Sequence, residues 1–222
     1  MLKSFKNQLM LKKKADPKGF YAIFTFFFYA LFTYELFNRP IGTVRNLEIA
    51  LDAKIPFIKE LIITYHTFMP MIILVGLLLF TYKKEEYKKY ILALFLSQTI
   101  AYVVFVFYQT YVPRYPMELL GDDIFSRLVA LTYKLNNNYA GAPSLHVCHM
   151  LLVSYYFSKI KMPIWVKVLG IGYFLLVAST TVLVKQHVFL DIPAGMVHAF
   201  LTVVFVEVIM RRRTPERKEV SL

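Results

Sequence analysis

Long apolar blocks separated by short charged segments constrain the fold of this chain more than any other feature. Most of these blocks hold about 18–22 residues, the length that an α-helix needs to cross a hydrocarbon layer roughly 30 Å thick. The charged side chains fall between the blocks, where a membrane helix leaves the hydrocarbon. With 58% hydrophobic and 18% charged residues, the chain is too apolar for an ordinary soluble domain. The sequence therefore predicts helices packed together in a lipid bilayer.

The predicted fold is an all-α integral membrane bundle of about six transmembrane helices, formed by one membrane-embedded domain over residues 1–222. We expect the fourth span, which is short, to continue through Ser158 to Ile160. Residues 1–19 and 211–222 are predicted to be basic cytoplasmic segments that flank the bundle. The six expected spans are Phe20–Phe37, Leu61–Tyr82, Tyr90–Tyr111, Leu145–Phe157, Val166–Leu183 and Ile192–Met210.

Two longer segments interrupt the spans on one side of the expected membrane. Within the first, Ala50–Phe57 mixes apolar and charged residues and is predicted to form a short amphipathic helix in the interface. The second, about Val112–Pro143, is rich in turn-forming residues and is expected to be a loop. Because loops longer than about 12–15 residues are commonly functional or disordered, the second segment is a candidate part of a site.

The lysines and arginines predict how the bundle is oriented. Eighteen of the 26 lie at the two ends of the chain and in the segments after the second and fourth spans, and eight lie on the opposite side. Basic residues gather on the cytoplasmic side of membrane proteins, so both termini are expected on the cytoplasmic side of a cell membrane that the chain crosses several times. The net charge of +12 is then mainly an orientation signal rather than a sign of nucleic-acid binding.

The composition also excludes several kinds of site. A single cysteine, Cys148, excludes an internal disulfide framework and any multi-cysteine zinc or iron–sulfur centre. No glycine-rich nucleotide loop occurs, and no carboxylate cluster of the kind that holds magnesium is evident. We therefore expect neither a metal nor an organic cofactor.

The residues with catalytic chemistry lie at the predicted outer ends of the spans. His146 opens the fourth span directly after Ala142-Pro143-Ser144-Leu145, and His187 precedes the sixth span. The chain enters the membrane after His146 and returns before His187, so the two histidines are expected at one face although 41 positions separate them. Arg114 follows the third span, which ends at the same face. One outward-facing site could therefore hold all of them.

His187 and Asp191 are four positions apart, so on a helical turn the carboxylate can hold one ring nitrogen and leave the other free to attack. A phosphorus centre is the natural target, because Arg114 and Lys185 can neutralise phosphoryl oxygens. The Ser144 hydroxyl would donate to the same phosphate, and His146 would protonate the leaving oxygen as general acid. Purely structural roles remain open for three of these residues: Ser144 is a good helix N-cap, and Arg114 and Lys185 could be interface anchors.

Together these motifs resemble the type 2 phosphatidic acid phosphatase superfamily, whose pattern is KxxxxxxRP, PSGH and SRxxxxxHxxxD. The match is Arg114 with Pro116, then Pro143-Ser144-Leu145-His146, then His187 with Asp191. The resemblance implies that His187 is the nucleophile, that Asp191 orients it, that His146 is the acid, and that Ser144 and Arg114 bind phosphate. It also implies a bundle of six membrane helices with an outward-facing site.

Three positions depart from that pattern. The first-motif lysine is Phe107, the glycine of PSGH is Leu145, and the serine–arginine pair is Thr180-Thr181. Two phosphate-binding cations of the family are therefore missing, and Lys185 could replace one of them. Together with Ile55-Pro56-Phe57, these departures resemble the branch that includes inositol phosphorylceramide synthases, which transfers headgroups between lipids.

The function expected from the sequence is a metal-independent phosphoric-ester hydrolase, a membrane lipid phosphatase that acts on a lipid phosphate or pyrophosphate through a phosphohistidine intermediate. Its expected partner is that lipid substrate within the bilayer. One alternative is a lipid phosphotransferase that moves a phospho-headgroup to a hydroxyl acceptor. Another is a non-enzymatic membrane protein, against which the presence of His146, His187 and Asp191 argues.

Overall fold

The computed structural model describes residues 2–213, and most of them are helical. These residues also form two very short strands, which pair in a two-stranded sheet, and three 3₁₀ helices of three residues each, Asp52–Lys54, Lys59–Leu61 and Met117–Leu119. In chain order the elements are α1 (Leu2–Ala15), α2 (Pro17–Phe37), β1 (Val44–Asn46), α3 (Ile62–His66), α4 (Phe68–Tyr82), α5 (Lys84–Phe107), β2 (Gln109–Tyr111), α6 (Ile124–Leu135), α7 (Leu145–Ser158), α8 (Ile164–Leu183) and α9 (Asp191–Arg213).

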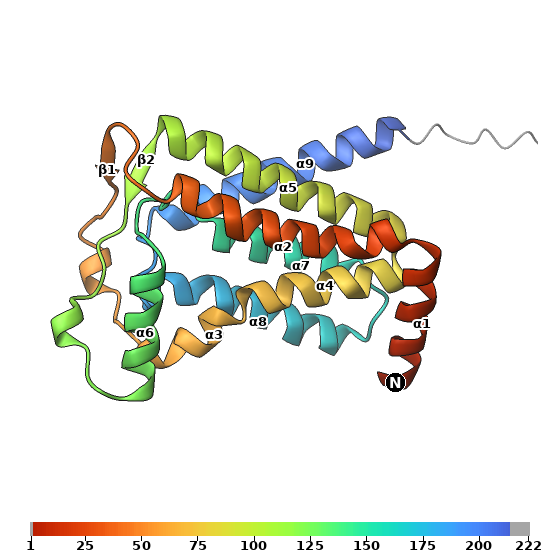
Figure 1. Ribbon diagram of the computed structural model, residues 1–222, viewed down its shortest axis with the longest axis horizontal. Helices are drawn as coiled ribbons and strands as arrows, with labels where there is room; N and C mark the ends of the chain where they lie inside the picture. Colours follow the sequence, from red (N-terminus) through yellow and green to blue (C-terminus); the bar gives the residue numbers. More distant parts are fainter. Residues whose placement is uncertain (1, 214–222) are drawn as a thin grey trace, which may run out of the picture.

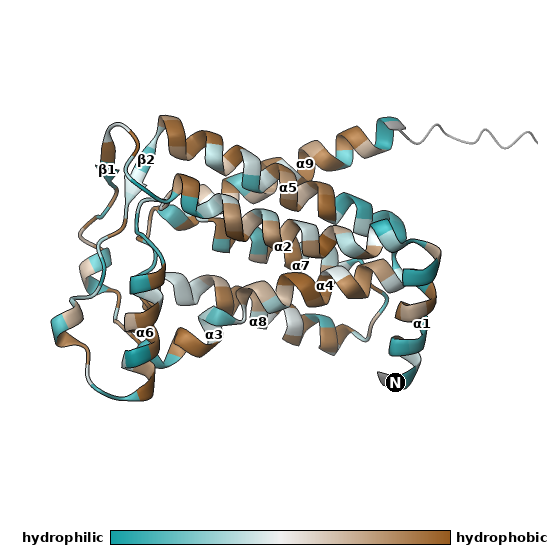
Figure 2. Ribbon diagram, in the orientation of Figure 1, coloured by the Kyte–Doolittle hydropathy of each residue, from teal (hydrophilic) through white to brown (hydrophobic). Residues whose placement is uncertain are grey.

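The long helices run side by side along the long axis of the molecule, whereas α1 and α6 lie across its two opposite ends (Figure 1). Hydrophobic residues dominate the middle of the bundle, and hydrophilic residues gather toward its ends (Figure 2). Within residues 2–213, five segments are long and apolar enough to cross a membrane: α2, the helical stretch from Lys59 to Tyr82, α5, α8 and α9. The predicted all-α membrane bundle is thus confirmed, with five of the six expected spans meeting this length.

The remaining predicted span is α7, which is the central helix of the bundle. It contains 14 residues and rises only about 21 Å, less than the thickness of the hydrocarbon layer. It ends at Ser158 and does not continue to Ile160 as expected. Its neighbours are α4, α5, α8 and α9, and most of its side chains are buried among them. A helix enclosed by protein does not have to match the membrane thickness by itself.

The helix starts follow from local capping chemistry. The Asp16 side chain accepts from the Gly19 backbone N–H at 2.9 Å, and Pro17 occupies the first turn of α2, where its missing N–H costs nothing. At the start of α7 the Ser144 hydroxyl accepts from the backbone N–H of Val147. Both caps satisfy amide donors that have no partner within the helix.

Two predictions for the outer segments were wrong. The segment around Ala50–Phe57 contains only a 3₁₀ turn, Asp52–Lys54, because its polar groups bond to other loops instead of continuing a helix. The expected loop Val112–Pro143 contains α6, which Asp123 caps by accepting from two backbone N–H groups. The Lys59 ammonium pairs with Asp123 and, by hydrogen bonding, holds the pKa of that carboxyl well below its usual range.

The third predicted span, Tyr90–Tyr111, also differs from the structure at both ends. Helix α5 begins earlier, at Lys84, and ends at Phe107. Residues 109–111 then pair in parallel with residues 44–46, with Thr110 opposite Arg45. This small sheet ties the first outer segment to the end of α5.

Both ends of the described chain lie at the same end of the bundle, and β1, β2 and α6 lie at the other (Figure 1). The expected basic segment 1–19 contains α1, which packs against α2 and α4. Within the other expected basic segment, α9 continues through Arg213, and residues 214–222 lie outside the described residues.

Candidate active site

The centre of the candidate site is the pair of His187 and Asp191. Asp191 is the first residue of α9 and is fully buried. One carboxylate oxygen, Oδ2, lies 2.9 Å from His187 Nδ1 and also accepts from the backbone N–H of Val188 at 3.1 Å. Because an ionised carboxylate only accepts hydrogen bonds, the neutral His187 ring carries its proton on Nδ1 and its lone pair on Nε2. This is the arrangement of an oriented nucleophile.

The free nitrogen of His187 faces the second histidine. His146 lies in the first turn of α7, and its Nδ1 is 3.4 Å from His187 Nε2. The His146 ring packs against Tyr65, with centroids 4.9 Å apart, and against Phe68, with centroids 4.3 Å apart. The structure therefore brings together the two histidines that 41 positions separate in the chain.

Ser144 joins the start of α7 to the start of α9. Its side chain is fully buried, and its hydroxyl caps α7 by accepting from Val147 N–H at 3.3 Å. Its own backbone N–H donates to the carbonyl of Asp191 at 3.3 Å. A Cβ added at Gly195 would lie only 2.7 Å from the Ser144 carbonyl, so a residue without a side chain allows the two helices to approach this closely. The structure gives Ser144 these backbone contacts, and its contact with phosphate stays a prediction.

Arg114 lies with His187 in the lining of an outer pocket, at the end of the bundle that carries α6. Its guanidinium donates to the carbonyls of Tyr133 and Asn137, both at 2.7 Å, and lies 4.8 Å from the centre of the Tyr133 ring. Burial lowers the pKa of Arg114 from its ordinary value, although a guanidinium remains charged at neutral pH. Its Nε, which is buried, has no hydrogen-bond partner among the described residues.

Lys185 lines the same outer pocket. Its ammonium donates to the carbonyls of Asp52 and Ile55 at 3.1 and 2.7 Å. Its backbone has a φ of 53°, a left-handed conformation that is uncommon for a residue with a side chain. Burial lowers the pKa of Lys185 below its usual value. The structure thus places both predicted cations in the lining of the pocket that His187 also lines, and both already donate to backbone carbonyls.

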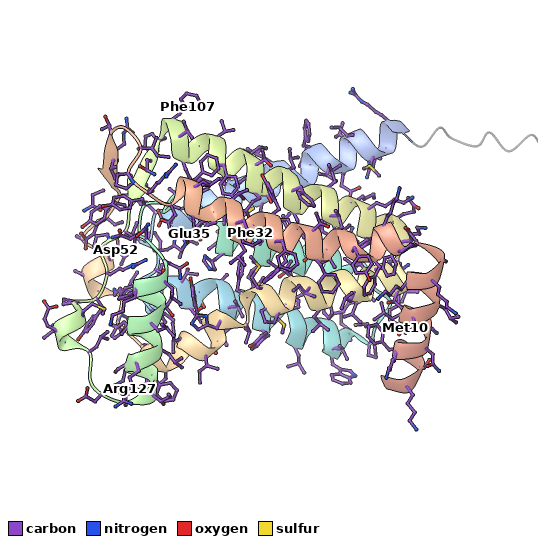
Figure 3. All side chains as sticks on the ribbon, in the orientation of Figure 1. Met10, Phe32, Glu35, Asp52, Phe107 and Arg127 are labelled. Atoms are coloured by element: carbon purple, nitrogen blue, oxygen red, sulfur yellow. The ribbon has the colours of Figure 1, made fainter. Side chains whose placement is uncertain are left out.

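Two pockets meet at His187. The outer pocket, of about 420 Å³, lies among the outer segments and is lined by Arg114 and Lys185. The inner pocket, of about 310 Å³, lies among α2, α3, α4, α5 and α7 and is lined by both His146 and His187. Its other lining includes the apolar Leu31 and the carboxylate of Glu35, which Figure 3 shows on α2. His187 is therefore reached from the outer loops and from the interior of the bundle.

Sequence reasoning missed several residues that shape the site. Asp52 accepts a hydrogen bond from the loop that carries His187. Thr110 accepts from the backbone N–H of Ala142, and a Cβ on Gly141 would lie 2.6 Å from the Thr110 hydroxyl and 3.2 Å from Asp191. The role of Asp52 depends on a contact between two irregular segments 137 positions apart, which no spacing in the sequence reveals. The role of Thr110 depends on the β1–β2 pairing, which the sequence did not reveal.

Within residues 2–213, no group of three or more histidine, cysteine or acidic side chains is placed so that it could hold a metal ion. The described side chains at the site are two imidazoles, one carboxylate and two cations.

The family model of the PAP2 superfamily matches residues 42–205, a stretch that contains every candidate site residue. No curated protein and no solved structure matches the chain.

Proposed function

The chain belongs to the PAP2 superfamily, and from this premise we propose that it is a membrane phosphatase that hydrolyses a lipid phosphate or pyrophosphate. Membership in this superfamily supports phosphatase-type activity on a lipid phosphate and does not identify the lipid. The observation that carries the finer proposal is the His187 ring, which bonds to Asp191 through Nδ1 and presents Nε2 toward His146. This geometry fits nucleophilic attack by one histidine and proton transfer by the other.

In the first step, the lone pair of His187 Nε2 forms a bond to phosphorus while the bond from phosphorus to the leaving oxygen breaks. His146, in its protonated form, gives its proton to that oxygen. The His187 ring becomes positively charged as it is phosphorylated, and the Asp191 carboxylate, 2.9 Å from Nδ1, stabilises this charge. Arg114 and Lys185, in the outer pocket, would neutralise the phosphoryl oxygens.

In the second step, water attacks the phosphohistidine and His146 takes its proton, which restores both histidines and releases phosphate. Asp191 does not take up a proton in either step, because its role is to hold the tautomer and to balance charge. No step in this scheme uses a metal ion, so we propose that the activity is metal-independent.

The two pockets suggest how a lipid substrate binds. The inner pocket lies among membrane helices, and its lining combines apolar side chains, such as Leu31 and Met69, with polar ones that include four histidines; its apolar part suits the membrane-embedded part of a lipid. The outer pocket carries the cations and suits a phosphate headgroup. A lipid phosphate could therefore occupy both pockets with its phosphorus at His187.

The distribution of basic residues supports a location for this site. The two ends of the described chain lie at the end of the bundle opposite the outer pocket (Figure 1). The segments expected on the side of the termini hold 18 of the 26 lysines and arginines. By the preference of lysine and arginine for the cytoplasmic side, we propose that both termini are cytoplasmic and that His187 faces the outside of the cell membrane.

A second candidate function is transfer of a phospho-headgroup to a hydroxyl acceptor, as in the inositol phosphorylceramide synthase branch. The inner pocket favours it, because Glu35, His66 and Gln98 could bind a hydroxyl near the phosphohistidine. The side-chain nitrogen of Gln186, in the same lining, is buried and has no hydrogen-bond partner among the described residues. An acceptor oxygen would satisfy that donor.

The two functions separate in one assay. The purified protein is incubated in EDTA with phosphatidate, a phosphatidylglycerol phosphate, a polyprenyl pyrophosphate and phosphatidylinositol, each with and without ceramide or diacylglycerol. Release of inorganic phosphate without an acceptor supports the phosphatase, whereas product that forms only with an acceptor supports the transferase. Activity that disappears in EDTA and returns with magnesium contradicts the metal-independent mechanism.

A further inference from the structure

The segment Ile49–Ile58, here called the outer segment, is bonded to the loop Val184–Leu190 that carries His187, here called the His187 loop. At one end of the loop, the backbone N–H of Ile58 donates to the carbonyl of Leu183 at 2.9 Å. Inside the loop, the Lys185 ammonium donates to two carbonyls of the outer segment. Beyond His187, the backbone N–H of Phe189 donates to a side-chain oxygen of Asp52 at 2.7 Å. These contacts lie on both sides of His187.

Asp52 is the centre of this connection. Its side chain is buried, with 7% of the residue exposed, and both carboxylate oxygens accept backbone hydrogen bonds. Oδ1 accepts from Phe189 in the His187 loop, and Oδ2 accepts from Ile49 in the outer segment at 2.9 Å. Its carbonyl accepts from Lys185. Figure 3 shows Asp52 at the end of the bundle where the outer segments lie.

The His187 loop needs such external support. It lies between the last residue of α8 and the first residue of α9, and Lys185 is in a left-handed conformation. The backbone N–H groups of Gln186 and His187 donate to the carbonyl of Thr181 in α8, whereas the N–H of Phe189 donates to Asp52 in the outer segment. Asp191 fixes only one nitrogen of the His187 ring. The position of Nε2 relative to phosphorus also depends on the loop backbone, which the Asp52 carboxylate contacts at Phe189, and the Asp52 carbonyl accepts from the Lys185 side chain. A displacement of about 1 Å at a reacting atom can lower a rate on the order of 100-fold.

We propose that Asp52 is a positioning residue, which holds the His187 loop so that Nε2 is aligned for attack on the substrate phosphorus. The inference rests on the proposed function, and it assigns to Asp52 a role that acts through the loop rather than on the substrate. The carboxylate suits this role because it supplies two acceptors, one for each segment. An asparagine would supply one acceptor and place a donor against the other backbone N–H, so Asp52→Asn keeps only part of the connection.

The test compares the full-length wild-type protein with Asp52→Ala, Asp52→Asn and Glu60→Ala. Glu60 is a matched control, since it is an exposed acidic residue two positions beyond the outer segment. Backbone hydrogen exchange of residues 184–190 is measured first, because it does not depend on turnover. Steady-state kinetics with dioctanoyl phosphatidate then separate kcat from KM.

We expect Asp52→Ala to exchange at residues 184–190 at least about tenfold faster, with kcat at least about tenfold lower and KM within about threefold of wild type. Asp52→Asn should fall between Ala and wild type, and Glu60→Ala should match wild type. Unchanged exchange in Asp52→Ala, or kcat within twofold of wild type, overturns the proposal. If Asp52→Ala does not purify as a folded protein, a wild-type kcat in folded Asp52→Asn overturns it equally.

The phosphatase function and the positioning role of Asp52 can be refuted independently of each other. If the wild-type protein does not hydrolyse any lipid phosphate, the proposed phosphatase function fails. The exchange measurement still decides whether Asp52 holds the His187 loop. If the wild-type protein is active and the Asp52 variants exchange and turn over normally, the function stands and the positioning role is refuted.

Discussion

Asp191→Asn is expected to reduce turnover severely without unfolding the protein. Asparagine has nearly the same shape as aspartate, so the buried site at the start of α9 can accommodate it. The substitution removes the negative charge that lies 2.9 Å from His187 Nδ1. It also allows the amide to present a donor where Nδ1–H and Val188 N–H both need an acceptor. The phosphorylated His187 ring then has no negative charge beside it, and its neutral form is no longer held with the proton on Nδ1.

The size of this effect follows from the charge that forms on the ring. When His187 is phosphorylated, its positive charge is centred roughly 4 Å from the carboxylate, which corresponds to about 4 kcal/mol at an effective dielectric constant near 20. One decade of rate corresponds to about 1.4 kcal/mol, so kcat should fall on the order of 1000-fold. A catalytic triad that loses its aspartate by the same substitution loses about 10⁴-fold, roughly one order of magnitude more.

The assay is single-turnover hydrolysis of a radiolabelled lipid phosphate by Asp191→Asn, by wild type and by Asp122→Asn. Asp122 is exposed in the loop just before α6, so its variant controls for the chemical change alone. Thermal unfolding of all three proteins establishes that each is folded. A folded Asp191→Asn protein whose rate lies within threefold of wild type would refute the reasoning, because it would show that the buried carboxylate does not assist attack.

Three further predictions concern the other residues of the site and the orientation of the bundle. His146→Ala should slow hydrolysis of alkyl phosphates much more than hydrolysis of p-nitrophenyl phosphate, because only the poorer leaving group needs a proton; equal losses for both substrates would contradict its role as general acid. Arg114→Ala and Lys185→Ala should each lower kcat/KM at least about tenfold, about 1.4 kcal/mol of transition-state stabilisation, and a normal kcat/KM in Lys185→Ala would show that this lysine only anchors the loop. Cysteine at Asp122 should react with an impermeant thiol reagent in intact cells and cysteine at Glu86 should not, and the reverse pattern would refute the orientation.

Much of the fold could be predicted because the membrane imposes a simple rule. Apolar segments such as Val166–Leu183 must be helical to satisfy their backbone hydrogen bonds in lipid, so length and hydropathy sufficed to locate them. The rule fails where protein replaces lipid as the surroundings. Helix α7 is short because its neighbours enclose it, and α6 lies among the outer loops, where hydropathy gives a weak signal.

The paired site residues could be predicted because short spacings and one membrane hairpin determine their positions. His187 and Asp191 are four positions apart, and a hairpin brings His146 to the same end of the bundle. Asp52 could not be predicted in the same way, since 137 positions separate it from Phe189 and no periodicity relates the two. Contacts between irregular segments depend on the packing of the whole bundle.

The most direct test of the mechanism is to trap the phosphohistidine at His187. The wild-type protein is mixed with a lipid labelled in its phosphate, quenched in alkali within the first turnover, digested and examined by mass spectrometry. The proposed mechanism predicts label on the peptide that contains His187, stable in alkali and lost in acid, and none in His187→Ala. Label on another residue, or normal turnover by folded His187→Ala, would contradict it.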